Sequence, residues 1–181
     1  MTTPDGDRPV VVFDIDGVLA DVRHRLHLVE GRRKDWDGFF AAAADDPPLS
    51  EGLQLARASA EDCDVVYLTG RPERCRADTL AWLDRHGLPP GSVSMRRSRD
   101  VRPSRVAKLE QLHRLARRRT VAVAIDDDPQ VCDAYERAGF RVLRAGWMAT
   151  APLSVGARGA AASPTAVRQV LHDAQERSGR T

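Results

Sequence analysis

Two acidic groups, each placed after an apolar run, carry the strongest chemical signal in this sequence of 181 residues. Residues 10–15 are apolar except for Asp14, and Asp16 and Gly17 follow them directly. Gly17 permits a turn there, so both carboxylates can face one site. Like charges this close repel, so a cation or a shared proton must offset them. Mg²⁺ fits, because it takes hard oxygen ligands from carboxylates and substrate phosphate.

The second acidic group follows the apolar run 121–125 and consists of Asp126, Asp127 and Asp128. Adjacent carboxylates at the end of a buried strand are hard to explain without a metal. A helix N-terminus also attracts acidic residues, and Asp128 suits that role because Pro129 follows it. We therefore assign Asp126 and Asp127 to the metal and Asp128 to the start of a helix.

Two further groups could hold a phosphate. Thr69, Gly70 and Arg71 follow another apolar run, and a hydroxyl with free backbone N–H groups at a helix start can bind an anion. Lys108 is one of only two lysines among 28 basic residues, in the second turn of a helix expected from a cap at Ser104. An inward ammonium would neutralise phosphoryl oxygens, whereas the alternative is a surface lysine.

These residues need a scaffold that brings strand ends together. Strands are expected at 10–15, 65–68, 92–95, 121–125 and 141–143, and helices at 51–62, 72–86, 104–118 and 129–138. Strands that alternate with helices predict an α/β fold, a Rossmann-like parallel sheet of about five strands with helices on both faces. Ligands of such sheets bind beyond the carboxyl ends of the strands, so the polar residues should meet in one crevice.

Two segments lie outside the alternating pattern. Residues 20–50 form an insertion directly after the first acidic turn, where it could cover the crevice; because it is short, we expect the crevice to be open. His24 and His27 fit surface or substrate contacts better than metal ligation. The aromatic residues of the insertion could stack on a base or anchor it to the core, and they are Trp36, Phe39 and Phe40.

The remaining sequence bounds the class of protein. We expect one domain over residues 1–181, with a core at about 9–147, loop-like residues 145–163 and a last helix at about 164–176. The polar N-terminus is not a signal peptide and no apolar run could span a bilayer, so the cytoplasm is the expected location. Three cysteines without a CxxC pair indicate neither a disulfide framework nor a zinc site.

Net charge is only +2, but ten basic residues lie within 96–119 against Asp100 and Glu110. This stretch could attract a polyanion, or it could be the solvated face of a helix. A P-loop sequence is not present, so kinase activity is not expected.

Taken in order, these motifs resemble those of the haloacid dehalogenase-type phosphatases over roughly residues 9–147. The stretches FDIDGVLAD, YLTGRPE, VAKLEQL and AIDDDPQV are most similar to the phosphatase half of polynucleotide kinase-phosphatase enzymes. DIDGVLAD also resembles nucleotidases of the deoxyribonucleotide type.

The resemblance implies roles for the motif residues. Asp14 would attack phosphorus and form an aspartyl-phosphate, and Asp16 would protonate the leaving oxygen and then activate water. Thr69 and Lys108 would hold the phosphoryl group, and Gly70 and Arg71 would contact the substrate. The Mg²⁺ ligands would be Asp14, Asp126, Asp127 and the main-chain carbonyl of Asp16.

The leading hypothesis is therefore a Mg²⁺-dependent phosphomonoesterase that acts on a nucleotide or on a nucleic acid 3′-phosphate end. A phosphatase of a small phosphorylated metabolite would share every catalytic residue and differ in the insertion. A binding protein on a disabled scaffold is a third possibility, and the intact set of acidic residues argues against it. No membrane and no protein partner are indicated.

Overall fold

One sheet of five parallel strands forms the centre of the computed structural model, which describes residues 8–30, 32–97 and 99–150. Its order is β3-β2-β1-β4-β5. The strands are β1 Val10–Phe13, β2 Asp64–Pro72, β3 Gly91–Arg96, β4 Val121–Asp126 and β5 Val142–Arg144. The predicted α/β fold with a parallel sheet is confirmed, and the predicted helix 164–176 lies outside the described residues.

The central strand β1 is apolar throughout because both of its faces are covered. Val11 and Phe13 belong to one buried cluster, and Val10 and Val12 belong to the other. Alternate side chains of a strand point to opposite faces, so four consecutive apolar residues supply two cores.

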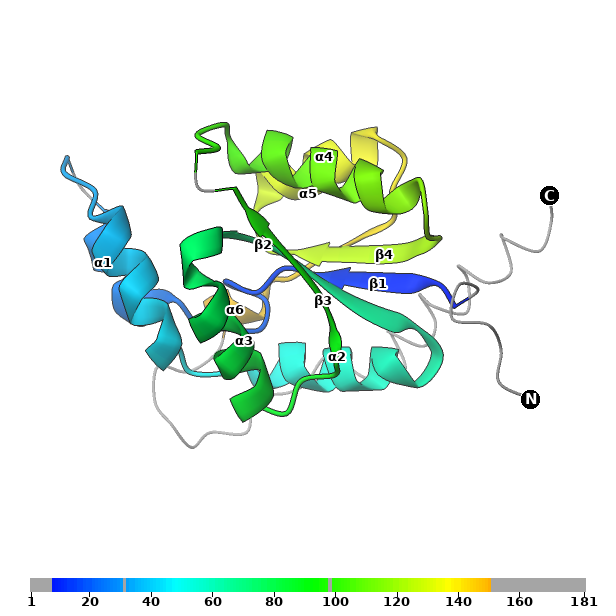
Figure 1. Ribbon diagram of the computed structural model, residues 1–181, viewed down its shortest axis with the longest axis horizontal. Helices are drawn as coiled ribbons and strands as arrows, with labels where there is room; N and C mark the ends of the chain where they lie inside the picture. Colours follow the sequence, from blue (N-terminus) through cyan, green and yellow to red (C-terminus); the bar gives the residue numbers. More distant parts are fainter. Residues whose placement is uncertain (1–7, 31, 98, 151–181) are drawn as a thin grey trace.

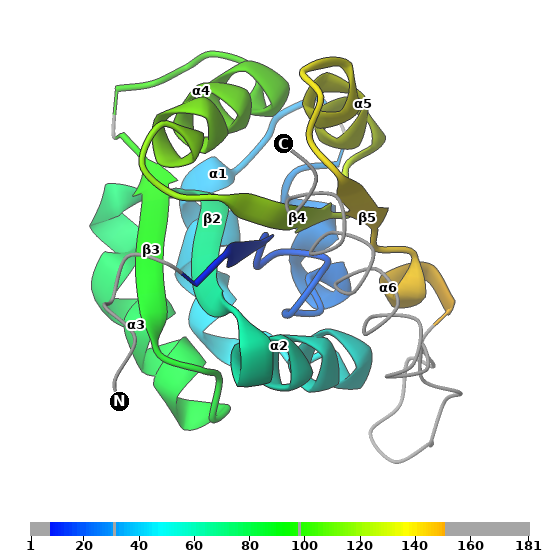
Figure 2. The ribbon, with the colours of Figure 1, turned by 90° about the vertical axis from the view of Figure 1, so that its right-hand side faces the viewer.

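Helices cover both faces of the sheet (Figures 1 and 2). On one face lie α2 Ser50–Asp62 and α3 Arg76–Arg85, which contribute Leu53 and Trp82 to the first cluster. On the other face lie α4 Ser104–Ala116 and α5 Pro129–Arg137. These helices contribute Leu112, Val131 and Tyr135 to the second cluster.

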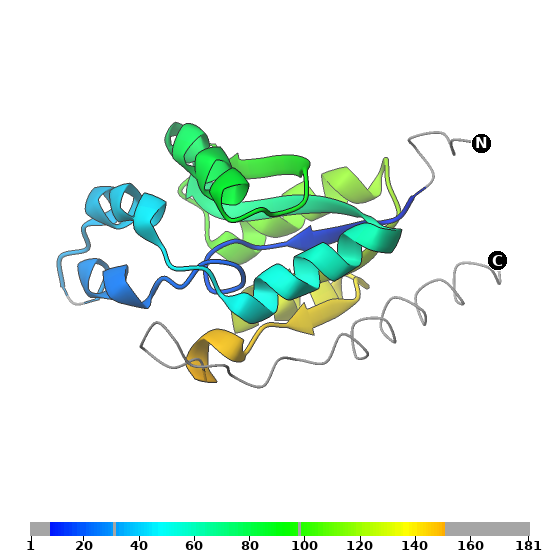
Figure 3. The same ribbon diagram turned by 90° about the horizontal axis from the view of Figure 1, so that it is seen from below.

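The insertion projects beyond the carboxyl ends of the strands (Figure 3). It consists of the 3-10 helix η1 Arg23–Leu28, the helix α1 Trp36–Ala41 and the 3-10 helix η2 Ala42–Asp45. Phe39 is buried, whereas Trp36 remains 48% exposed. Phe39 therefore anchors the insertion to the core, and Trp36 faces outward.

Several expected boundaries differ from the structure. The strand β2 continues through Thr69, Gly70 and Arg71 to Pro72, because Pro72 pairs with Arg96 of β3 after a register shift. The segment expected to bind phosphate is therefore part of a strand and not a helix start. After β2, the 3-10 helix η3 Glu73–Cys75 precedes α3.

The structure also defines the buried face of α3 and the first residue of α4. Leu80 of α3 is 44% exposed, whereas Trp82 and Leu83 of the same helix are buried. Ser104 is the first residue of α4 and not its cap, which is Pro103.

The segment after β5 is not entirely a loop, because Trp147–Thr150 form the short helix α6. The indole Nε1 of Trp147 donates a hydrogen bond to the carbonyl of Val18 at 2.9 Å, which ties this helix to the turn after β1. The rest of the predicted loop 145–163 lies outside the described residues. Within the described part of the chain, no helix has the length and apolar character needed to cross a bilayer.

Candidate active site

Strands β1 and β4 are neighbours, so their carboxyl ends bring the two acidic groups together. Asp14 follows β1, and Asp126 is the last residue of β4. The Lys108 ammonium, on α4, lies 2.8 Å from Asp14 Oδ2 and 2.7 Å from Asp126 Oδ2. All three side chains are buried. Of the two expected positions for Lys108, the structure therefore shows the inward one.

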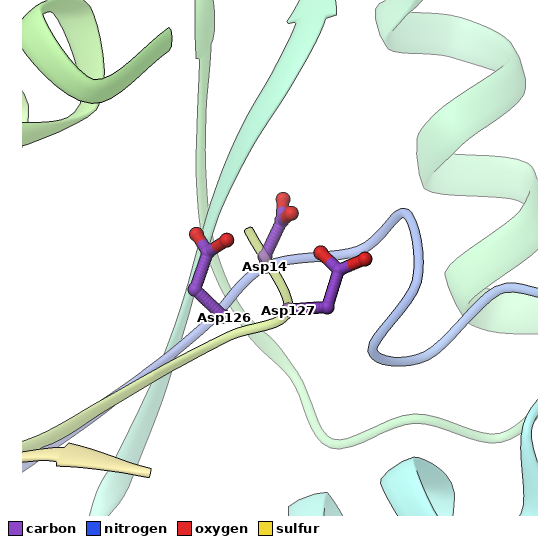
Figure 4. A group of neighbouring side chains, drawn as sticks. All are labelled: Asp14, Asp126 and Asp127. Carbon is purple, nitrogen blue, oxygen red and sulfur yellow. The ribbon is translucent and has the colours of Figure 1, made fainter. Parts of the chain in front are cut away.

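Asp127 completes a group of three carboxylates (Figure 4). One oxygen from each of Asp14, Asp126 and Asp127 lies within 4.8 Å of the others. Gly17 makes this approach possible: its φ is +80°, and a Cβ there would stand 2.0 Å from Asp127 Oδ2. We call Asp14, Asp126, Asp127 and Lys108 the carboxylate floor.

The carboxylate floor carries an excess of negative charge. Burial raises the pKa of Asp14 well above its usual value, and Asp126 and Asp127 raise it further, while Lys108 lowers it. Burial and Asp126 raise the pKa of Asp127 to about 6. Although burial opposes it, Asp126 and Asp14 hold the pKa of Lys108 well above its usual value, so the ammonium stays charged.

This floor fits a magnesium ion. Asp14 Oδ1 is buried and has no hydrogen-bond partner among the described residues. Three carboxylates around one ammonium leave charge that a second cation would balance, and Mg²⁺ prefers such oxygen ligands. Asp128 is separate: it caps α5 by accepting a hydrogen bond from the Gln130 N–H at 2.8 Å, as the sequence suggested.

Asp16 lies apart from this floor, held by two arginines. Its Oδ1 accepts hydrogen bonds from Arg25 Nη2 at 2.8 Å and from Arg71 Nε and Nη2 at 2.9 and 2.6 Å. Although burial raises the pKa of Asp16, Arg71 and Arg25 outweigh it and lower the pKa. The side chain of Asp16 is therefore not among the grouped carboxylates that could hold a metal, and Arg71 binds the carboxylate of Asp16.

Sequence reasoning missed Arg25 and Asp46. Arg25 is fully buried, and the Asp46 side chain has no exposed surface. Asp46 contacts Arg25, Arg71 and His24, so His24 binds an acid of the protein. We call Asp16, Asp46, Arg25 and Arg71 the arginine cluster. The only available signal was an Asp-Asp-Pro-Pro string, which is typical of turns.

Thr69 and Gly70 lie at the strand end beside the floor. Thr69 is fully buried, and its Oγ1 accepts a hydrogen bond from the Arg71 N–H at 3.2 Å. Gly70 lines the cleft described next.

A cleft of about 750 Å³ opens above the floor. Asp14, Asp16, Lys108 and Asp127 form its base, and two other segments contribute much of the rest of its lining. The helix α1 contributes Trp36, Phe39 and Phe40, and the segment after β3 contributes Arg96, Arg97 and Arg102. The insertion therefore borders the site without sealing it, and it leaves room for a nucleotide.

The rings of the insertion form a small cluster. Trp36 and Phe40 are stacked, with centroids 6.0 Å apart and an interplanar angle of 24°. The Arg74 guanidinium lies 5.8 Å from the Phe40 ring centroid. Aromatic faces and guanidinium groups thus border the same cleft.

Solved structures with this fold include several hydrolases. A chain of a Pnkp1/Rnl/Hen1 RNA repair complex is similar with a TM-score of 0.63 and 23% identity, over 79% of this chain and 45% of that one. A haloacid dehalogenase-like hydrolase from Xanthomonas campestris gives 0.60 and 12% identity, over 98% and 97%. A class C acid phosphatase from Bacillus anthracis, solved with tungstate bound, gives 0.58 and 12% identity, over 94% and 80%.

These likenesses show the fold, and the chain spans less than half the length of the Pnkp1 chains that it matches. No curated protein matches the sequence. The model of the polynucleotide kinase PNKP phosphatase domain matches residues 8–146, which include the carboxylate floor and the arginine cluster. The chain therefore belongs to this family of haloacid dehalogenase-type phosphatases.

Proposed function

We propose that this phosphatase is a Mg²⁺-dependent phosphomonoesterase with Asp14 as its nucleophile, acting on a nucleotide or a nucleic acid 3′-phosphate end. The observation that carries the proposal is the set of contacts around the Asp14 carboxylate. Its Oδ2 is bound by Lys108, its Oδ1 is buried without a partner, and the carboxylate lies at the base of an open cleft.

Asp14, Asp126 and Asp127 would hold the magnesium ion, together with the main-chain carbonyl of Asp16. When bound, the ion would neutralise negative charge on the phosphoryl oxygens and on the Asp14 carboxylate. The group of three carboxylate oxygens supports this assignment.

In the first step, a carboxylate oxygen of Asp14 attacks phosphorus and the bond from phosphorus to the leaving oxygen breaks. Asp16 gives its proton to that oxygen, so the product leaves as an alcohol. The Lys108 ammonium balances the charge of the transferring group, and Thr69 lies at the same strand end to position it. Asp16 lines the cleft, which supports this role.

In the second step, water attacks phosphorus and the aspartyl-phosphate breaks down to Asp14 and inorganic phosphate. Asp16, now a carboxylate, takes a proton from the water and is ready for the next cycle. The low pKa that the two arginines give Asp16 favours this base form, whereas the incoming substrate must favour its acid form.

The lining of the cleft supports a nucleic acid end as the substrate. Arg97 and Arg102 offer guanidinium groups of the kind that bind phosphate oxygens. Trp36 and Phe40 offer rings on which a base can stack. Arg97 and Arg102 are both exposed, and Arg102 also donates hydrogen bonds to Asp100 and Glu110.

The test is phosphate release, with and without Mg²⁺, from a panel of phosphomonoesters. The panel holds 3′- and 5′-phosphorylated single-stranded oligonucleotides of DNA and RNA, 3′- and 5′-mononucleotides, sugar phosphates and an aryl phosphate. We expect Mg²⁺-dependent turnover with preference for 3′-phosphorylated ends. Preference for one sugar phosphate would indicate that the substrate is a small metabolite. No phosphate release from any substrate would contradict the proposal.

A further inference from the structure

We propose that Asp46 is a positioning residue for the acid step. In this role it holds Arg25 and Arg71, and through them it fixes Asp16 so that one oxygen of Asp16 faces the leaving group. The inference rests on the proposed function, because it takes Asp16 as the proton donor.

The first support is the number of contacts that the Asp46 carboxylate makes. Its Oδ2 accepts hydrogen bonds from Arg25 Nη2 at 2.6 Å and from Arg71 Nη2 at 2.7 Å. Its Oδ1 accepts one from Arg25 Nε at 2.7 Å and lies 2.8 Å from His24 Nε2. Both oxygens are therefore committed to holding other side chains, and no surface of the carboxylate remains for substrate.

The second support is the way in which the arginines divide the oxygens of Asp16. All three of their hydrogen bonds end on Oδ1, and Oδ2 accepts none of them. The Asp16 side chain is 22% exposed and lines the cleft. Oδ2 is thus the oxygen left for a proton and for the leaving group.

The third support is geometric. Arg25 Nη2 lies between Asp46 Oδ2 and Asp16 Oδ1, and Arg71 Nη2 lies between the same two atoms. A planar guanidinium can serve two carboxylates at once, and the direction of its N–H groups is fixed by the partner that it already has. Without Asp46, both guanidiniums would lose the contact that sets their orientation.

The insertion thereby becomes part of the acid step and is more than a border of the cleft. Asp46 follows η2, Arg25 belongs to η1, and Arg71 comes from β2. The Asp46 main-chain carbonyl accepts a hydrogen bond from Trp82 Nε1 at 2.8 Å, which fixes its place against the core helix α3. Three distant segments thus meet at one carboxylate.

The test compares two substrates that differ in their need for a proton donor. An activated aryl phosphate, such as 2,4-dinitrophenyl phosphate, has a leaving group that departs without one, whereas a 3′-phosphorylated oligonucleotide has an alkoxide leaving group. Asp46→Asn keeps the shape of the side chain but places an amide donor against the guanidiniums. We expect its kcat/KM to fall roughly 10- to 100-fold for the oligonucleotide and by less than about threefold for the aryl ester.

Two further variants make the result decisive. Arg25→Lys keeps the buried charge but lacks the planar fork of N–H groups with which Arg25 holds Asp46 through Nε and Nη2 and Asp16 through Nη2. It should therefore give the same substrate-dependent loss even if Asp46→Asn does not fold. Asp64→Asn is the matched control, because it removes an arginine partner, that of Arg119, at the opposite end of β2. Its effect should be the same for both substrates.

Equal losses on both substrates in Asp46→Asn and Arg25→Lys, or no loss, would overturn the positioning role while the phosphatase assignment stands. A wild-type protein that hydrolyses neither substrate with Mg²⁺ would instead overturn the proposed function, and the inference with it. The wild-type rates therefore distinguish the two failures.

Discussion

Two neighbouring groups of buried carboxylates differ in how their charge is balanced. In the carboxylate floor, Asp14, Asp126 and Asp127 face the single ammonium of Lys108. In the arginine cluster, the two carboxylates face two guanidiniums, and each carboxylate contacts both. The uneven group is suited to binding a cation and a phosphoryl group, and the balanced group is suited to holding a side chain in place.

The most severe change to the floor is Asp14→Asn. It should reduce Mg²⁺-dependent phosphate release by more than about a thousandfold, because an amide cannot serve as the nucleophile. Steady-state release from the best substrate of the panel is the measurement, with circular dichroism to show that the variant is folded. Activity within tenfold of the wild type would remove Asp14 from its proposed role.

Replacing the one cation of the floor should come next in size. Lys108→Met keeps the length of the side chain and removes its charge, so we expect kcat to fall by roughly 100- to 1000-fold on every substrate. The uniform loss contrasts with the substrate-dependent loss expected in the arginine cluster. A loss confined to oligonucleotides would place Lys108 in substrate recognition instead.

Loss of a carboxylate should change the free energy of unfolding in opposite directions in the two groups. In the arginine cluster, Asp46→Asn leaves two buried guanidiniums with one carboxylate, and removal of a partner from a buried ion pair costs about 3–5 kcal/mol. Urea unfolding of the metal-free protein measures this loss. A change of less than about 1 kcal/mol would mean that water or rearrangement compensates the lost carboxylate.

In the floor, Asp127→Asn should stabilise the metal-free protein at pH 8. A carboxyl whose pKa is raised from 3.8 to about 6 in the folded state resists ionisation, so its cost is present above about pH 6 and is relieved as the pH falls through 6. The substitution should add about 1–3 kcal/mol to the free energy of unfolding in a chelator at pH 8, roughly half as much at pH 5, and little below about pH 4. Saturating Mg²⁺ should stabilise the wild type more than Asp127→Asn. If the variant remained the more stable protein with Mg²⁺, the metal assignment would be contradicted.

The smallest expected effect lies outside both groups, at the border of the cleft. Trp36→Ala should raise the KM for 3′-phosphorylated oligonucleotides roughly tenfold, because stacking of a base on an aromatic ring contributes about 1–3 kcal/mol. It should leave the aryl phosphate unaffected. Leu80→Ala is the control, because it removes an exposed apolar side chain from a different helix, α3. Equal changes for both substrates would mean that Trp36 acts on the floor and not on a base.

The contrast also marks what could be predicted from the sequence. The floor could be predicted because Asp14 and Asp126 end apolar runs, and parallel strands bring their carboxyl ends to one edge of the sheet. The prediction of Lys108 depended on the expected register of its helix and on the observation that lysine is rare in this chain. The roles of these residues in catalysis remain predictions.

The arginine cluster could not be predicted in the same way. Arg25 and Asp46 belong to residue types that are ordinarily exposed, and nothing local indicates that they are buried. Their pairing depends on how η1, η2 and β2 pack, which is tertiary information. Likewise, Gly70 and Pro72 indicated the end of a strand, but pairing with β3 extends β2 through them.

The shared carboxylate of Asp46 also restricts how this sequence can diverge. A substitution there leaves two guanidiniums without their common partner, so a chain that loses the acid is under pressure to lose an arginine as well. In an alignment of relatives, the positions of Arg25, Asp46 and Arg71 should therefore vary together, although 20 or more residues separate each from the next. The inheritance of the three as a unit would record the geometry of the cluster across the family.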